Sequence, residues 1–500
     1  MKKILNIVTA LVIAFSAAGC KDYFDINYDP NIPASENITT SMIFPGVDAA
    51  LATSYGDFLR ITGGYFSEQY AQMFGTSNYL DYSQFTMSAT RSSTHYTQLY
   101  QKVLVNCETI KQKALEANDY GTNLAATAIS AFAFQILVDA YGETPYLEAF
   151  NSEIMAPAYD DGQVVYNGII EKLDEALGLA SEGQQIAKNL LYPSGNSTDW
   201  IKFANTVKLK ILMRMSNVAN VNTVLAELIG KDNFITSDAQ YAGCWSNASG
   251  QYSPFYSEEF NAGMQKNVVL NAALLATMKT GEYTDPRLAA WFEPNSSGNY
   301  IGGISGTNLA ATAAAPYNSA SGLCRPRIVY NTPVSIISVA EVEFFKSEYY
   351  AKNNSMDKAE QCYENAVIAS FKSAGLSESD AQEYFKHFPF DASNYEKCIG
   401  VAKWVALSGI NNFESWCELR RLGYPAFGDV KGSDMWTGAD VDASAISSLA
   451  PGTLYTPYLV FDQVGAGKLL QRWPYSNASQ SRNSNCPNFP GYTTPVFWAK

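Results

Sequence analysis

A helical hairpin at residues 333–374 constrains this chain more than any other feature. Its first helix is predicted to start at Thr332, whose side chain can cap it, and Pro333, which fits the first helical position. Small and apolar residues then recur on one helix face, so a second helix can approach closely. The residues on that face are Ile337, Ala340, Phe344 and Ser347.

The second helix of the hairpin follows a turn at residues 352–355, where Ser355 can cap it. The spacing of Ala359, Tyr363 and Ala366 is typical of the second helix in a tetratricopeptide repeat. An ordinary antiparallel helix pair is the alternative interpretation. In either case one hairpin cannot bury both of its faces, so other helices must stack on it.

Three more helix pairs are predicted from apolar residues at helical spacing. They lie near residues 93–141, 163–217 and 395–422. Residues 230–330 differ, because they are rich in Gly, Ser, Asn and Ala with scattered aromatic residues. A long irregular insertion in a helical protein is more often functional than filler. The sequence therefore predicts a mostly α fold, with about four helix pairs and a large irregular, loop-rich half that faces the ligand.

The composition indicates which ligands suit the chain. A net charge of −14 argues against nucleic acid, because there is no basic stripe to neutralise phosphates. Hydrophobic residues make up 47% of the sequence, which is enough for a large core. Only 16% of residues are charged while 13% are aromatic, including 32 tyrosines, which favours neutral polar ligands over ionic ones.

No catalytic or metal-binding pattern stands out, so the chain is predicted to be a binding protein without a cofactor or metal. Among the eight cysteines there is no metal-binding spacing, and Cys107 and Cys362 lie in helical patterns as small hydrophobes, so no disulfide framework is expected. His95 and His387 are isolated and are predicted to be capping or surface residues.

Two charged pairs also have simple structural interpretations. Glu341 and Glu343 could suggest glycosidase chemistry, but at i and i+2 they point to different helix faces. Arg420 and Arg421 follow Glu418 at a helix end, where positive charge compensates the helix dipole and can pair along the helix surface.

The first 40 residues are predicted to target and tether the protein. Residues 1–19 combine two lysines with a short apolar run and read as a signal peptide. Small residues precede Cys20, which is the pattern that a lipoprotein signal peptidase accepts, so Cys20 is predicted to be lipidated. An ordinary secretory signal is the alternative. Residues 20–40 then form a flexible tether, and no later run reaches the roughly 18 apolar residues that a membrane helix needs.

Aromatic residues in polar loops are the candidates for ligand binding, because flat rings can stack on sugar rings. They occur in two segments, 75–92 and 245–320, which the helical body is expected to bring to one side. The first candidates are Tyr79, Tyr82, Trp291, Tyr300 and Tyr317, and Trp245, Tyr252 and Tyr256 come next.

Four groups of residues follow one another along the chain: Cys20 with 24–27 and 29–31, then 139–146, then 340–344 with 347–348, then Trp416 with 420–425, 472–475 and 483–485. Together they resemble the SusD/RagB family of outer-membrane lipoproteins. The chain departs from the family pattern at Ser476 and Asn477, where an acid usually follows shortly after a Tyr-Pro pair, so it resembles a divergent branch.

This resemblance implies a single domain over residues 41–500, built on tetratricopeptide-like helix pairs. It also implies a lipid anchor in the outer membrane, facing the cell surface. The implied partner is a SusC-type TonB-dependent transporter, over which the lipoprotein sits as a lid. The implied ligand is an oligosaccharide taken up as a nutrient, or a peptide in some members. A secreted glycan hydrolase and a tetratricopeptide adaptor are the rival hypotheses.

The anchor can be tested by replacing Cys20 with alanine. Without the thiol no lipid can be attached, so Cys20→Ala is expected to move the protein from the membrane pellet to the soluble fraction. Cys486→Ala is the matched control and is expected to stay with membranes. A Cys20→Ala variant that still sediments with membranes, and wild-type protein without lipid by mass spectrometry, would contradict the prediction.

Overall fold

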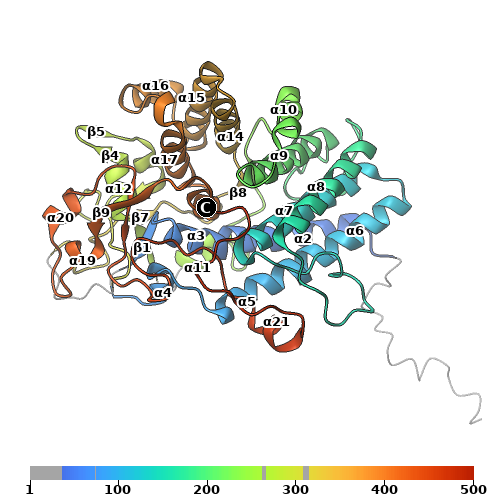
Figure 1. Ribbon diagram of the computed structural model, residues 1–500, viewed down its shortest axis with the longest axis horizontal. Helices are drawn as coiled ribbons and strands as arrows, with labels where there is room; N and C mark the ends of the chain where they lie inside the picture. Colours follow the sequence, from blue (N-terminus) through green and yellow to red (C-terminus); the bar gives the residue numbers. More distant parts are fainter. Residues whose placement is uncertain (1–36, 74, 262–265, 308–314) are drawn as a thin grey trace, which may run out of the picture.

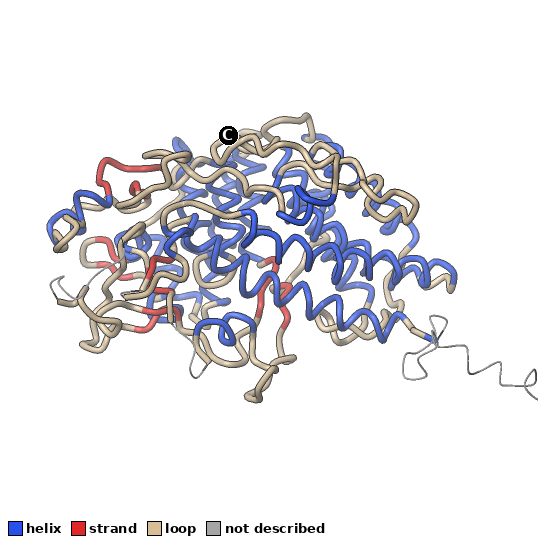
Figure 2. The backbone as a smooth tube through the Cα atoms, turned by 90° about the horizontal axis from the view of Figure 1, so that it is seen from below, coloured by secondary structure: helices blue, strands red, loops and turns tan. Residues whose placement is uncertain are grey.

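A computed structural model of the chain describes residues 37–73, 75–261, 266–307 and 315–500. Long helices occupy the right and upper parts of Figure 1, and short strands and loops gather on its left. Figure 2 shows strands only as short pieces among helices and loops. The mostly α fold class is therefore confirmed. The predicted signal peptide, Cys20 and most of the tether lie outside the described residues.

The N-terminal helices form the first part of the helical body. Helix α7 packs against both α6 and α8, and α2 packs across α6. The elements are α2 (Thr40–Ser54), the π-helix η3 (Tyr55–Leu59), α3 (Arg60–Phe66), α5 (Ala89–Gln98), the π-helix η4 (Leu99–Leu104), α6 (Val105–Glu116), α7 (Tyr120–Tyr141), α8 (Gly162–Leu179), α9 (Ser197–Met215) and α10 (Asn222–Lys231).

The C-terminal helices complete the predicted pairs. Helices α14 and α15 form the hairpin, and α17 packs on both α18 and α14. The elements are α14 (Val339–Lys352), α15 (Met356–Ser373), α16 (Glu378–His387), the 3-10 helix η5 (Ala392–Asn394), α17 (Tyr395–Leu407) and α18 (Asn412–Leu422). With α6–α7 and α8–α9, these pairs account for the four that the sequence predicts.

The remaining elements are short and belong mainly to the irregular half. They are β1 (Tyr70–Gln72), α4 (Leu80–Ser83), β2 (Ala239–Tyr241), α11 (Pro254–Glu259), β3 (Val268–Leu270), α12 (Ala272–Met278), β4 (Lys279–Thr280), β5 (Tyr283–Thr284), α13 (Arg287–Trp291), β6 (Phe292–Glu293), β7 (Arg325–Pro326), β8 (Val334–Ile337), β9 (Ala426–Lys431), α19 (Gly432–Met435), α20 (Ala443–Ser447), β10 (Thr453–Thr456) and α21 (Asn477–Arg482). Within the described ranges, the strands pair only in twos.

The hairpin forms as predicted except at its start. Val334–Ile337 is a strand that pairs with β2, so the predicted cap at Thr332 and Pro333 is wrong and Ile337 is not on the helix. The helix begins at Val339 instead, because Ser338 and Glu341 form a reciprocal capping box. All four strand residues are buried, and this run rich in β-branched residues fits a strand buried on both faces.

The close approach of the two hairpin helices is confirmed. The Ser347 hydroxyl donates a hydrogen bond to the carbonyl of Ala359, with 2.7 Å between the oxygens. Ala366 is fully buried in a second core cluster with Phe344 and Tyr363. Ser355 precedes α15, but its side chain makes no capping hydrogen bond.

Two further boundaries differ from the prediction. The predicted loop at 75–92 contains α4 and the start of α5, where Ser88 caps the helix. Within the irregular insertion the sequence also favours one helix, at 268–280. The structure divides this run into β3 and α12, because Asn271 caps α12 and the residues before it pair with β1. In both places a local cap decides where the helix begins.

Helix α7 lies at the centre of the helical body. Its sequence is long and apolar enough to cross a membrane, contrary to the expectation that no such run exists, yet its apolar window is entirely buried inside the protein. Of its 22 residues only the first, Tyr120, is not buried, so neighbouring helices and the C-terminal segment surround it. A helix that is apolar on all sides belongs in a core of this kind.

A cluster of buried charges joins the helices around α7; we call it the charge cluster. Lys210 and Arg214 on α9 meet Glu414 at 2.8 and 2.6 Å, and Lys403 on α17 meets Glu418 at 2.9 Å. Each of these side chains is almost completely buried, so each charge depends on its partners. The cluster also includes Asp139 of α7, Glu341 and Glu348 of α14 and Arg421 of α18.

Arg420 and Arg421 lie in the last turn of α18, and Arg421 pairs with Glu418, as the sequence predicts, but both arginines are buried rather than on the surface. Arg421 donates to Glu348 at 2.8 Å inside the charge cluster. Arg420 donates to the carbonyls of Asp139 and Gln471, at 2.8 and 2.6 Å, and stacks over Trp416. Both arginines join α18 to other parts of the chain.

The two histidines and two of the cysteines can also be compared with their predicted surroundings. His95 is buried rather than on the surface and shares a short hydrogen bond with Ser54. His387 is exposed, as predicted for a surface histidine, and stacks on Tyr283. Cys107 and Cys362 are buried, as the sequence predicts.

The hairpin packing can be tested at Ala366. Replacing it with arginine would force a long charged side chain between α14 and α15, so Ala366→Arg is expected to lower the free energy of unfolding by several kcal/mol. Gln361→Arg, on the exposed side of α15, is the matched control. Chemical denaturation measures both variants, and equal stability of the two would contradict the packing.

The charge cluster predicts a pH dependence carried by Glu348. Burial would raise the pKa of Glu348, but the Arg421 guanidinium outweighs burial and lowers this pKa from 4.5 to about 2. The ionised carboxylate therefore stabilises the fold above about pH 4.5, and this contribution is lost as the pH falls towards 2. The shift corresponds to roughly 3 kcal/mol.

We expect Glu348→Gln to cost on the order of 3–5 kcal/mol at pH 7, because it leaves buried cations uncompensated. The difference in unfolding free energy between wild type and this variant should narrow between pH 5 and pH 2. Glu360→Gln, at an exposed position of α15, is the control and should show no such trend. A difference in unfolding free energy that stays constant from pH 5 to pH 2 would contradict the role assigned to Glu348.

Candidate functional site

The two aromatic segments predicted to lie on one side of the body do meet. Strand β1, just before residue 75, pairs antiparallel with β3, and Ala71 lies opposite Val269. The Gly306 amide donates to the Ser83 hydroxyl at 2.7 Å, which ties the later part of the insertion to α4. These elements lie together at the left of Figure 1.

The structure places Tyr79 and Tyr82 inside this half rather than on its surface. Their exposed fractions are 5% and 2%, and the two rings stack with centroids 5.6 Å apart. Arg91 covers the ring of Tyr82 at 4.9 Å. The premise that these rings are open to a ligand is therefore wrong, because other side chains already occupy their faces.

Trp291 and Tyr317 are also largely buried. A Cβ atom at Gly409 would lie 2.3 Å from the Trp291 ring, so the indole packs directly on the backbone there. Tyr317 is 8% exposed, and burial raises its pKa to about 12. Both residues therefore lie in the core and have no open ring face. Their binding role stays a prediction.

Tyr300 is partly exposed, unlike the other four first candidates. It follows a tight loop built around Asn295, whose side-chain oxygen accepts from the amides of Ser297 and Asn299 at 3.0 and 2.9 Å. The Asn295 amide group donates to Gly322, which joins the loop to a distant segment. Tyr300 is thus held on a rigid loop, and its binding role stays a prediction.

Three partly exposed rings lie just before, within and just after the short helix α11; we call them the aromatic row. They are Tyr252, Tyr256 and Phe260, spaced four residues apart. The first two ring centroids are 5.3 Å apart, and the Tyr256 and Phe260 rings stack at 6.4 Å. The guanidinium of Arg325 lies 4.4 Å from the centre of the Phe260 ring.

Carboxyl groups on and near α11 tie the aromatic row to neighbouring elements. Glu258 accepts a hydrogen bond from the Tyr79 hydroxyl at 2.9 Å. Glu259 accepts from the amides of Asn267 and Val268, which fixes the end of α11 to β3. Burial raises the pKa of the Asp57 carboxyl well above its ordinary value, and the nearby Glu258 and Glu259 raise it further.

This arrangement offers stacking faces together with hydrogen-bond acceptors. Hydroxyl groups of a neutral polar ligand can donate to Glu258 while its apolar faces lie on the rings. Among residues 37–500, outside the undescribed positions, there is no group of three or more His, Cys, Asp or Glu side chains arranged to hold a metal ion.

The family model described as "Starch-binding associating with outer membrane", a SusD-like family, matches residues 35–440. The chain belongs to this SusD-like family. No curated protein matches the sequence. Membership of this family makes the SusD-like chain a carbohydrate-binding, nutrient-binding protein that associates with the outer membrane.

Solved structures share the SusD-like fold over nearly the whole chain. A chitin-binding protein is 19% identical, with a TM-score of 0.70, over 91% of this chain and 99% of that one. A SusD homologue from Bacteroides uniformis is 20% identical, with a TM-score of 0.70, over 92% and 97%. A SusD/RagB family protein from Bacteroides thetaiotaomicron is 18% identical, with a TM-score of 0.70, over 92% and 99%.

Most of the stretches that carried the family resemblance have structural roles in this SusD-like chain. Arg472 binds the carbonyl of Tyr141 and the carboxylate of Glu143, so the stretches at 139–146 and 472–475 meet. Trp473 stacks on Trp416 with centroids 5.7 Å apart. These residues hold the C-terminal segment on the helical body.

The sequence analysis placed Tyr252 and Tyr256 second and did not single out Phe260, and the binding role of all of these rings stays a prediction. Their regular spacing of four residues is visible in the sequence. It does not arise from one helix, because α11 contains only Tyr256 of the three. Burial of Tyr79 and Trp291 depended on contacts with distant segments, and the sequence carries no local sign of those.

Proposed function

We propose that this SusD-like protein captures a neutral oligosaccharide at the aromatic row and Tyr300, and delivers it to a SusC-type TonB-dependent transporter. The family description supports carbohydrate binding at the outer membrane. The lipidated Cys20 would anchor the protein at the cell surface, with the segment to residue 40 as its tether. The protein acts by binding, and no catalytic step is required.

The aromatic row is the observation that carries this proposal. Its three rings are partly exposed, follow one another at centroid separations of 5.3 and 6.4 Å, and border the carboxylate of Glu258. Stacking is modest for each ring, so several rings must act together. The affinity should accordingly lie in the micromolar to millimolar range, about −8 to −4 kcal/mol.

Rigid support makes such a row effective despite modest contacts. Glu259 fixes one end of α11 to β3, and the amide of Ser253 donates to the carbonyl of Tyr330 at 2.7 Å at the other end. Because the backbone is held at both ends, the rings lose little conformational freedom when a ligand binds. This favours recognition of an extended, chain-like ligand.

The proposal can be tested by titrating starch-derived oligosaccharides and a peptide panel by calorimetry. We expect Tyr252→Ala, Tyr256→Ala or Phe260→Ala to weaken oligosaccharide binding by about 1–3 kcal/mol where the ring is a hot spot. Tyr300→Ala should show a smaller loss. Tyr350→Ala, at a partly exposed tyrosine on α14, is the matched control and should bind as wild type does.

Each outcome of this test is informative. Unchanged oligosaccharide binding in all four folded variants would contradict the site. Binding of peptides but not of oligosaccharides would favour the peptide-binding alternative. Release of shortened products from a labelled oligosaccharide would favour a glycan hydrolase, and tight protein partners without any small ligand would favour an adaptor.

A further inference from the structure

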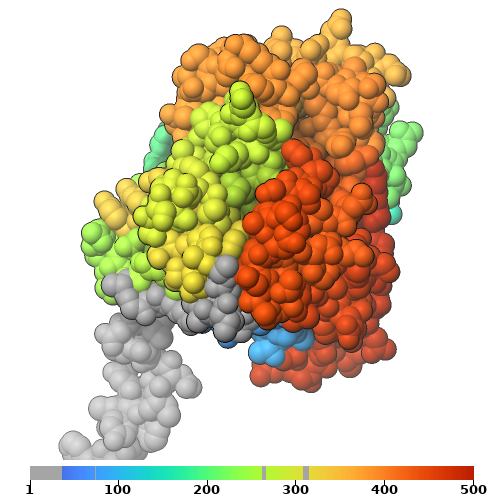
Figure 3. All heavy atoms as spheres, turned by 90° about the vertical axis from the view of Figure 1, so that its left-hand side faces the viewer, coloured from blue at the N-terminus to red at the C-terminus, as the bar shows by residue number. Residues whose placement is uncertain are grey.

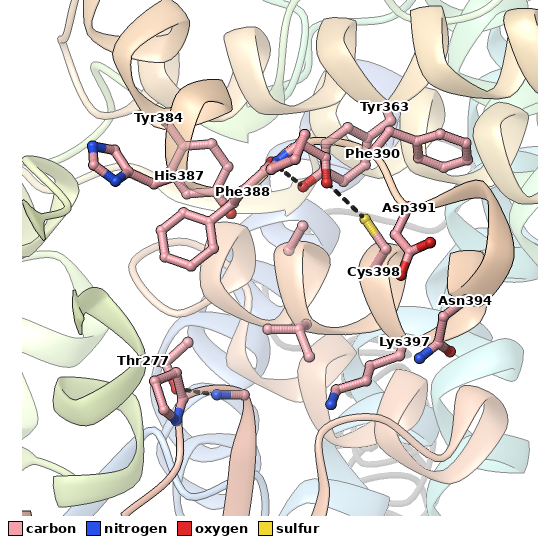
Figure 4. A pocket seen from close by; sticks show the side chains of 15 residues that line it. Thr277, Tyr363, Tyr384, His387, Phe388, Phe390, Asp391, Asn394, Lys397 and Cys398 are labelled. Atoms are coloured by element: carbon pink, nitrogen blue, oxygen red, sulfur yellow. Dashed lines mark hydrogen bonds between the residues drawn. The ribbon is translucent and has the colours of Figure 1, made fainter. Parts of the chain in front are cut away.

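A pocket lies away from the aromatic row, between α16, α17, α12 and the turn before β10. Its volume is about 570 Å³, which is within the usual range for small-molecule sites. No residue of the aromatic row or of α11 lines it. Figure 4 shows its side chains from close by, and the segments that form it meet on the face shown in Figure 3.

Aromatic rings form the apolar side of this pocket. Tyr384 of α16 is buried, whereas Phe388 and Phe390 are partly exposed. Pro389 stands between the two phenylalanines and, because the residue before a proline disfavours the helical conformation, α16 ends at His387. Phe388 therefore has a non-helical backbone, and its ring faces the pocket in Figure 4.

Helix α17 supplies the polar side. Asn394, Lys397 and Val401 line the pocket at spacings of three and four residues, which places them on one side of the helix. Within the described residues, Lys397 has no ion-pair partner, although the chain carries a net charge of −14. Figure 4 shows its side chain running across the pocket towards Thr277.

The wall opposite α16 is a fixed turn rather than a side chain. The Gly452 amide donates to the Thr277 hydroxyl at 2.9 Å, which joins the turn to α12. A Cβ atom at Gly452 would lie 3.1 Å from Val401, so glycine allows the turn to approach α17 closely. Its φ of +68° also favours glycine. The pocket is thus a preformed feature with defined walls.

We propose that this pocket binds a small carboxylate-bearing sugar, of the uronic acid class. The apolar face of the sugar ring would stack on Phe388, and its carboxylate would pair with the ammonium group of Lys397. Asn394 and Asp391 on the rim can accept hydrogen bonds from the sugar hydroxyls. This inference does not depend on the proposed capture of oligosaccharide at the aromatic row.

The test uses glucuronate and glucose as paired probes, which differ at the carboxylate. Ligand-observed nuclear magnetic resonance titration should show glucuronate binding at least several-fold more tightly than glucose. Lys397→Gln should weaken glucuronate binding about tenfold while leaving glucose binding unchanged, because only the charged hydrogen bond is lost. Phe388→Ala should weaken binding of both sugars, because the stacking face is removed.

Two controls make the result specific to this pocket. Lys386→Gln removes an exposed lysine that pairs with Glu383 outside the pocket, and should bind glucuronate as wild type does. Tyr252→Ala in the aromatic row should also leave glucuronate binding unchanged. No glucuronate binding by wild type, equal binding of glucose and glucuronate, or normal binding by Lys397→Gln would each overturn the proposal.

Discussion

The buried charge cluster is the interaction on which the rest of the structure depends. Its members come from α7, α9, α14, α17 and α18, so one set of ion pairs fixes five helices relative to one another. Pairing in a water-free core is directional, and a small shift of one helix would leave a charge without its partner. Such a cluster contributes more to a unique arrangement than to raw stability, because desolvation offsets much of the attraction.

The helical body in turn fixes the C-terminal segment and the irregular half. Arg420 extends the cluster outwards by donating to two backbone carbonyls, and Trp416 both stacks on Trp473 and donates to the carbonyl of Leu470 at 2.8 Å. Short paired strands such as β1–β3 then join loops from distant parts of the chain. The loops are irregular in conformation but are held at both ends, which is what recognition by several weak contacts needs.

The two candidate binding surfaces lie on different elements and offer different groups to a ligand. At the aromatic row, Glu258 and Glu259 are held by hydrogen bonds from Tyr79, Asn267 and Val268. The pocket at α17 is lined by Asp391 and by Lys397, which has no ion-pair partner among the described residues.

The sequence by itself determined the helix pairs, because amphipathic spacing and caps are local properties that a single segment records. It also predicted the close contact at Ser347 and Ala366 from residue size alone. It could not determine that the run at 334–337 becomes a strand, since that depends on pairing with β2. The burial of Tyr79 and the pairing of Arg421 with Glu348 were likewise decided only by the tertiary structure. An aromatic or charged residue gives the same local sequence signal whether its side chain is buried or exposed. Only the packing of distant segments decides whether that side chain faces water, a ligand or the core.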